Sequence, residues 1–210
     1  MSKPLFSFRL PLFDHAEAAE RPVRHFKPQR LVILACSGTK RPGAGTMPAR
    51  ERYDGPLWQT LRTAAPKGHR AQVAFLSARY GFRTADTPIA DYDARLNREL
   101  AERMIAGGMT TRWPRPPSPA KPDNYGIHPG CEIASLRHSA SGPFLDVALV
   151  GGAFYLEVMR AFLAGFQEMG HVAENAVVTE INGAIGIMRR DLRAWLHSAD
   201  VLREVHPWGA

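Results

Sequence analysis

The stretch at residues 31–40, which reads Leu-Val-Ile-Leu-Ala-Cys-Ser-Gly-Thr-Lys, constrains the fold of this chain more than any other. Its first part, Leu31 to Ala35, is apolar without interruption, and so short a run is typical of a strand buried on both faces, as in a parallel sheet. Polar residues follow at once, at the strand end where an open α/β sheet usually binds its ligand. We therefore expect a substrate-binding turn that consists of Cys36, Ser37, Gly38, Thr39 and Lys40.

Three later apolar runs share this pattern and predict three further strands, at residues 73–76, 146–150 and 176–179. Patterns of helical period separate them, so the chain is expected to form a single three-layer α/β domain with a mainly parallel sheet of about four strands. The domain is predicted over residues 30–210, preceded by an N-terminal arm at 1–29 that four prolines keep from forming a long helix. A proline-rich loop is inserted at 110–130.

The chain is basic, with 27 lysines and arginines against 20 acidic residues in a length of 210. This charge favours acidic partners, such as nucleic acid, nucleotide phosphate or anionic lipid, although an arginine-rich surface without such a partner would explain it equally well. Two cysteines and the absence of an eighteen-residue apolar run indicate neither a disulfide framework nor a membrane span. Because the first residues also lack a secretion signal, we expect a cytoplasmic protein.

A second polar turn, Ser77-Ala-Arg-Tyr-Gly81, follows the second predicted strand. Turns at the same end of two strands in one sheet would open on one crevice, so Ser77, Tyr80 and Gly81 are candidate substrate-binding residues beside Lys40. Arg50 and Tyr53 lie in a short predicted helix just beyond Lys40 and are expected at the rim of the same cavity. The alternative is that Arg50 is an ordinary surface arginine and Tyr53 a half-buried tyrosine.

Two carboxylates flank an aromatic ring in the stretch Asp91-Tyr92-Asp93, directly before a helical pattern. A carboxylate near the crevice could act in catalysis, but an acid at this place could also cap the helix. Capping is the favoured role for Asp91, whereas for Asp93 the two roles are equally open. Later, the pair Gly151 and Gly152 joins a strand to a helix, where backbone amides could approach an anion or the glycines could simply allow tight packing.

Basic side chains outside these turns form two further groups that could contact nucleic acid. One group lies in the proline-rich loop and consists of Arg112, Arg115 and Lys121. The other lies on one face of the last predicted helix and consists of Arg189, Arg190 and Arg193. Three arginines on one helical face more often form a solvated surface than a phosphate contact.

The motifs C-S-G-T-K, P-A-R-x-x-Y-D-G, L-S-A-R-Y-G and I-A-D-Y-D together resemble a family of small bacterial and phage proteins. More distantly, they are similar to the peroxide-stress protein YaaA and to a domain of archaeosine synthase. The similarity covers residues 30–105 well and 146–197 loosely. It implies a setting in nucleic-acid or modified-base metabolism and a site near Cys36, Ser37, Lys40, Arg50, Tyr53, Ser77, Tyr80, Asp91 and Tyr92. The predicted sheet is also compatible with that of uracil-DNA glycosylases, although their catalytic acid after the first strand is replaced here by residues 36–40.

These features favour an enzyme that acts on a nucleobase, nucleotide or nucleic acid, most plausibly at an N-glycosidic bond. Asp93 or Asp91 would stabilise the cationic sugar or activate water, and Tyr80 or Tyr92 would stack on the base. Phosphate or the base edge would be bound by Lys40, Ser37 and Thr39, and Lys40 is also a candidate catalytic residue beside the two aspartates. The alternative is a nucleic-acid-binding module without catalysis, for example in DNA damage or in conflict between phage and host. No cofactor and no metal ion are expected.

Overall fold

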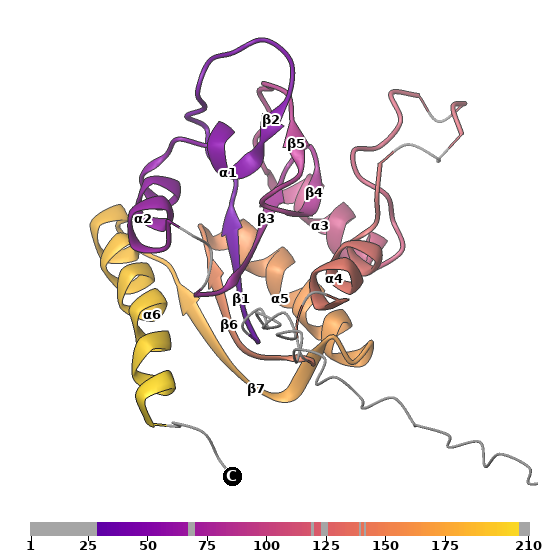
Figure 1. The fold of residues 1–210 in the computed structure, drawn as a ribbon. Coiled ribbons are helices and arrows are strands. Elements are labelled where there is room, and N and C mark those ends of the chain that lie inside the picture. The colour runs from indigo at the N-terminus through magenta and orange to yellow at the C-terminus, as the bar shows by residue number, and fades with distance from the viewer. Residues whose placement is uncertain are drawn as a thin grey trace, which may run out of the picture.

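Five strands form one mixed sheet in the order β4-β3-β1-β6-β7 (Figure 1). In the centre, β1 (Arg30–Ala35) pairs in parallel with β3 (Gln72–Ser77) on one side and with β6 (Phe144–Val150) on the other. The sheet continues in parallel to β7 (Val172–Ile181) and ends at the opposite edge with β4 (Gly81–Thr84), which is antiparallel to β3. This computed structural model describes residues 29–66, 70–118, 120–122, 126–138, 140 and 142–205.

Alternate side chains of β1 point into two separate cores, because successive residues of a strand face opposite sides of the sheet. Val32 and Leu34 pack toward α2 (Pro56–Ala64) and α6 (Ile185–Val205). Leu31 and Ile33 pack toward the other core, to which three helices contribute: α3 (Arg98–Gly107), α4 (Pro129–His138) and α5 (Ala153–Glu168). Residues 31–34 have no exposed surface, as the uninterrupted apolar run predicts.

The prediction of a single α/β domain with a mainly parallel sheet between helices is confirmed, and all four predicted strands are present. The fifth strand, β4, was not predicted because Gly81 was assigned to the preceding turn and the strand has only four residues. Helix α4 was not predicted either. The proline-rich stretch before α4 has neither helix nor strand among its described residues, and its backbone pairs once, between Trp113 and Ile127. The predicted N-terminal arm lies outside the described residues, except for Gln29.

A second, two-stranded sheet connects loops that are far apart in the sequence. Its strands β2 (Met47–Pro48) and β5 (Pro88–Ile89) are antiparallel, and α1 (Ala49–Arg52) follows β2 directly. Two backbone hydrogen bonds extend the contact, from the Ala49 and Arg50 amides to the carbonyls of Thr87 and Ala85. The loop after β5 is thereby held beside the loop after β1.

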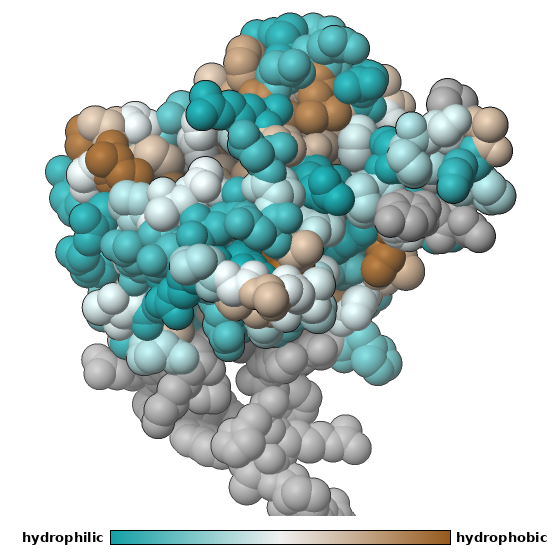
Figure 2. All heavy atoms as spheres, turned by 90° about the horizontal axis from the view of Figure 1, so that it is seen from above, coloured by the Kyte–Doolittle hydropathy of each residue, from teal (hydrophilic) through white to brown (hydrophobic). Residues whose placement is uncertain are grey.

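The order of the strands places a topological switch point between β1 and β6. From β1 the chain continues to β3 on one side, whereas from β6 it continues to β7 on the other side. Such a point opens a crevice at the carboxyl ends of the strands, which is where α/β proteins commonly bind ligands. Figure 2 looks onto this end of the molecule, where hydrophilic residues cover most of the surface and hydrophobic ones form separate small patches. Within the described residues, no helix combines the length and the apolar content that a membrane-spanning segment requires.

Candidate functional site

The turn after β1 is fixed by its pairing with the residues that follow α1. The Asp54 amide donates to the Thr39 carbonyl at 2.9 Å, and the Arg41 amide donates to the Arg52 carbonyl at 2.7 Å. Between these bonds, Lys40 and Tyr53 form an antiparallel bridge. The backbone of Lys40 is therefore held in place, which fixes the point from which its side chain extends.

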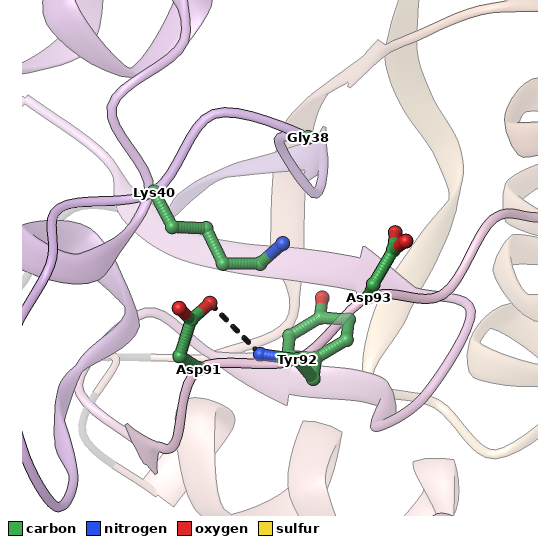
Figure 3. A pocket seen from close by; sticks show the side chains of 5 residues that line it. All are labelled: Gly38, Lys40, Asp91, Tyr92 and Asp93. Carbon is green, nitrogen blue, oxygen red and sulfur yellow. Dashed lines mark hydrogen bonds between the residues drawn. The ribbon is translucent and has the colours of Figure 1, made fainter.

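A pocket of about 430 Å³ opens beside this turn, and it is lined by Gly38, Lys40, Asp91, Tyr92 and Asp93. Figure 3 shows the Lys40 side chain reaching across the pocket above the Tyr92 ring, with Asp91 and Asp93 on either side of that ring. Gly38 and Lys40 come from the turn after β1, whereas the other three follow β5. The pairing of β2 with β5 accounts for this meeting of residues about fifty positions apart.

The ammonium group of Lys40 lies 4.3 Å from the centre of the Tyr92 ring. A cation at this distance is attracted by the negative face of the ring, which positions it without neutralising it. Among the described residues, Lys40 forms no ion pair within 4 Å. The positive charge is thus available to an anionic ligand.

The two carboxylates of the pocket differ in their hydrogen bonds. The Asp91 carboxylate accepts a hydrogen bond from the Tyr92 amide at 2.9 Å. Asp93 is exposed, and its carboxylate has no partner among the described side chains and amides. The prediction that Asp91 caps the next helix is wrong, because Asn97 is the N-cap of α3 and accepts from the Leu100 amide. Neither carboxylate is therefore needed to begin that helix.

Beneath the pocket, three buried hydroxyl groups bond to one another. The Tyr92 hydroxyl lies 2.6 Å from that of Tyr53 and 2.8 Å from that of Ser77. Burial, above all, raises the pKa of both tyrosines, because the phenolate would lose its hydration. The hydroxyls consequently remain protonated at neutral and mildly alkaline pH, and they fix the Tyr92 ring under the Lys40 ammonium.

Cys36 lies at the switch point itself. Its Sγ is 3.1 Å from the hydroxyl of Tyr155, in the first turn of α5. Burial is the main cause that raises the pKa of Tyr155, and the neighbouring Cys36 is the second. The Tyr155 hydroxyl therefore also stays protonated. Gly151 makes the approach possible, since a β-carbon at that position would lie 3.0 Å from Cβ of Ala35 and 3.1 Å from Cβ of Tyr155. Gly152 is the exposed N-cap of α5.

The two polar turns lie side by side at the same end of the sheet, as predicted, because β1 and β3 are parallel neighbours. Residues 77–81 are not among the described lining residues of this pocket, and they contact Tyr92 from behind. The Tyr80 ring contacts the Tyr92 ring edge-on at 5.2 Å, and the Tyr80 hydroxyl accepts from the Ala90 amide. Gly81 has a positive φ of 65° and turns the chain into β4.

Arg50 and Tyr53 do not line the pocket, contrary to the prediction that both form its rim. Arg50 Nε instead pairs with Asp86 at 2.6 Å, and Tyr53 is completely buried. Tyr92 is only 8% exposed, which leaves little of its ring for stacking on a base. Its position suits it to hold Lys40.

The remaining basic candidates lie outside this pocket. Arg112 donates to the Gly126 carbonyl, and Lys121 is exposed. Arg115 lines two neighbouring hollows. On α6, Arg189 donates to the Thr60 hydroxyl, Arg190 pairs with Asp191, and Arg193 is exposed. Ser37 accepts a hydrogen bond from the Thr39 amide.

Sequence reasoning missed three residues that shape this region, namely Arg52, Arg79 and Tyr155. Arg52 is completely buried although it is charged, and nothing in its local pattern indicates this. Tyr155 had a local signal, since a tyrosine in the first helical turn after a glycine pair lies close to the crevice. Arg79 lies in the second polar turn, between Ser77 and Tyr80, which were predicted to bind substrate.

Replacing Tyr92 by phenylalanine should lower the free energy of unfolding by about 2 kcal/mol, because the buried Tyr53 hydroxyl loses its partner. The ring that holds Lys40 remains, so ligand affinity should change little. Urea denaturation measures the first effect. Tyr80→Phe is the matched control, and it should cost less, since that hydroxyl is half-buried and accepts one bond of 3.2 Å. Equal stability of wild type and Tyr92→Phe would contradict the role of the hydroxyl cluster.

Among the described residues, no group of three or more His, Cys, Asp and Glu side chains is placed to hold a metal ion. The two cysteines are not bonded to each other. Comparisons with protein-family models, with curated proteins and with solved structures found no match for this chain.

Proposed function

We propose that this protein is an enzyme that cleaves the N-glycosidic bond of a nucleotide unit. The observation that carries the proposal is that Lys40, Asp91 and Asp93 share one open pocket, at the carboxyl ends of the sheet, without neutralising one another by close ion pairs. An anion site beside two carboxylates suits a substrate that carries a phosphate and reacts at its sugar.

Lys40 supplies the binding of the phosphate. Its ammonium is held over the Tyr92 ring, and it retains its hydrogen-bond donors for an anionic oxygen. A pocket of about 430 Å³ falls in the range that binds small molecules. The exposed Gly38 leaves space at the entrance, because a β-carbon there would meet no atom within 4 Å.

Asp93 supplies the chemistry. Cleavage of an N-glycosidic bond builds positive charge on the sugar, and a nearby carboxylate stabilises that charge or removes a proton from the attacking water. Asp93 is better suited than Asp91, whose carboxylate already accepts the Tyr92 amide. In this scheme water adds to the anomeric carbon, the bond to the base nitrogen breaks, and the base leaves with a proton.

The test is release of free base from a panel of nucleosides, nucleoside monophosphates and single-stranded oligonucleotides, followed by chromatography. Lys40→Gln should raise KM for a monophosphate about tenfold, since one charge-assisted hydrogen bond is lost, and it should leave KM for a nucleoside unchanged. Arg41→Gln is the matched control, because Arg41 is adjacent and half-exposed but faces Asp54. Absence of base release from every member of the panel would refute the proposal.

A second candidate is a nucleic-acid-binding module without catalysis. It is favoured by the formal charge of +7 and by the arginines that line the hollows next to the pocket. The same panel separates the two functions, because a module of this kind would bind oligonucleotides and release no base from them.

A further inference from the structure

Two adjoining hollows lie on the side of Tyr92 where Arg79 is found, and all their charged lining residues among those described are arginines. One has a volume of about 390 Å³, and Arg79, Trp113 and Arg115 are among its lining residues. The other has a volume of about 380 Å³ and shares Trp113 and Arg115, to which it adds Arg103. Among the described residues, no carboxylate lines either hollow. Both therefore offer a positive environment to an anionic partner.

Arg79 connects these hollows with the substrate pocket. Its guanidinium carbon lies 5.8 Å from the centre of the Tyr80 ring and 6.0 Å from that of Tyr92. Tyr92 lines the substrate pocket, whereas Arg79 lines the first hollow. Lys40, Arg79, Arg115 and Arg103 therefore form a series of cations, which we call the cationic track.

Two of these cations are not neutralised within the fold. Arg79 and Arg103 are exposed, and neither forms an ion pair or a side-chain hydrogen bond with another described residue. By contrast, Arg189 and Arg190 on α6 have partners in Thr60 and Asp191. The charges of Arg79 and Arg103 are thus available to an anionic partner.

The wall between the two hollows is anchored to the sheet. Trp113 is 5% exposed, and its backbone exchanges two hydrogen bonds with Ile127, at 3.1 and 3.0 Å. The buried Arg83 guanidinium donates to the carbonyls of both residues. Gly81 provides the space, since a β-carbon there would come within 2.7 Å of the Trp113 side chain. This part of the proline-rich stretch is therefore a fixed surface.

Trp113 carries a buried donor without a partner in the described part of the chain. Its indole Nε1 is buried and has no acceptor among the described residues, although such donors are nearly always satisfied in proteins. The tryptophan lines both hollows.

We propose that the cationic track binds a single strand of nucleic acid and leads one of its nucleotides into the substrate pocket. The inference rests on the proposed function, because it takes the pocket to accept a nucleotide unit. A lone mononucleotide would use Lys40 and leave Arg79 and Arg103 idle, whereas a strand presents successive phosphates to successive cations. A single strand is favoured over a duplex, since a base reaches an active-site pocket only when it is unpaired.

The test measures binding of a fluorescein-labelled oligothymidylate of roughly 16 nucleotides, within the site sizes of single-strand binding proteins, by fluorescence anisotropy. Arg79→Gln/Arg103→Gln should weaken binding about tenfold and reduce the slope of log affinity against log salt by about 1.4, which is two single-strand phosphate contacts. Affinity for thymidine monophosphate should stay unchanged. The matched control is Arg190→Gln/Arg193→Gln on α6, which removes the same charge and should alter neither ligand's affinity.

Equal weakening by both double variants would overturn the proposal, because it would show that only net charge matters. So would oligothymidylate binding no tighter than that of thymidine monophosphate. All replaced side chains are exposed, and thermal unfolding of each variant verifies its fold. Asp93→Asn separates the reaction from strand binding, because this variant should lose base release and retain its affinity for the strand. A protein that binds the strand through the track but releases no base would refute the reaction and leave the track supported.

Discussion

Asp93→Asn should lower the turnover of base release by about 10²–10⁴-fold, the range usual for loss of a general acid or base. The amide keeps the shape of the side chain and loses its charge, so substrate affinity should remain close to that of the wild type. Stability should also be unchanged, because Asp93 is exposed and has no partner among the described residues. Single-turnover release of base, equilibrium binding and urea denaturation measure the three quantities.

Two further variants separate the carboxylates. Asp91→Asn retains an oxygen that accepts the Tyr92 amide, and it should reduce turnover less than Asp93→Asn does. Asp86→Asn is the matched control, since Asp86 is an exposed aspartate that pairs with Arg50 away from the pocket, and it should leave turnover unchanged. A loss of affinity as large as the loss of turnover in Asp93→Asn would make Asp93 a binding residue and contradict its proposed role.

Arg52→Met should lower the free energy of unfolding by about 3 kcal/mol, an order-of-magnitude value for charge-assisted hydrogen bonds lost from a buried site. The Arg52 guanidinium is completely buried and donates to the carbonyls of Arg41, Gly43 and Gly45, at 2.9, 3.2 and 2.8 Å. It thereby closes the exposed loop after Lys40. The substitution also removes the cost of burying a charge. The expected decrease in the free energy of unfolding is therefore smaller than the summed contribution of the three hydrogen bonds.

The same variant should weaken binding of a monophosphate, because the Arg52 backbone and side chain both hold the segment that begins at Lys40. Arg52→Lys tests the geometry, since one ammonium does not reproduce the planar fork that serves three carbonyls. Arg193→Met, at an exposed position of α6, is the control and should change stability by less than about 0.5 kcal/mol. A stability of Arg52→Met equal to that of the wild type would show that the loop is held by other contacts.

Some residues that were predicted to bind a ligand have structural roles instead. Ser77 and Tyr53 were expected to face a ligand, yet both are completely buried and bond to the Tyr92 hydroxyl. Their polar groups complete a buried cluster, which an apolar core tolerates only when every member has a partner. The polarity of these residues correctly indicated the end of the sheet at which they lie. It did not indicate on which side of Tyr92 they lie.

The layers of the fold, and the end of the sheet at which the proposed site lies, follow from the order of apolar and polar residues along the chain. The run Leu31 to Ala35 is apolar on every residue, and only a strand covered on both faces buries all of them. The polar residues directly after β1 and β3 then lie at one edge, because parallel strands end on the same side. These conclusions depend on local pattern and connectivity, which a sequence displays directly.

The set of side chains that share the pocket depends on contacts between distant parts of the chain. Asp91 and Asp93 reach Lys40 because β2 and β5, about forty residues apart, pair with each other, and strands of two residues carry no pattern that a sequence reveals. Arg52 and Arg83 were unpredictable for a related reason. A buried guanidinium is stable only where carbonyl oxygens from distant loops surround it, and those positions exist only once the chain has folded.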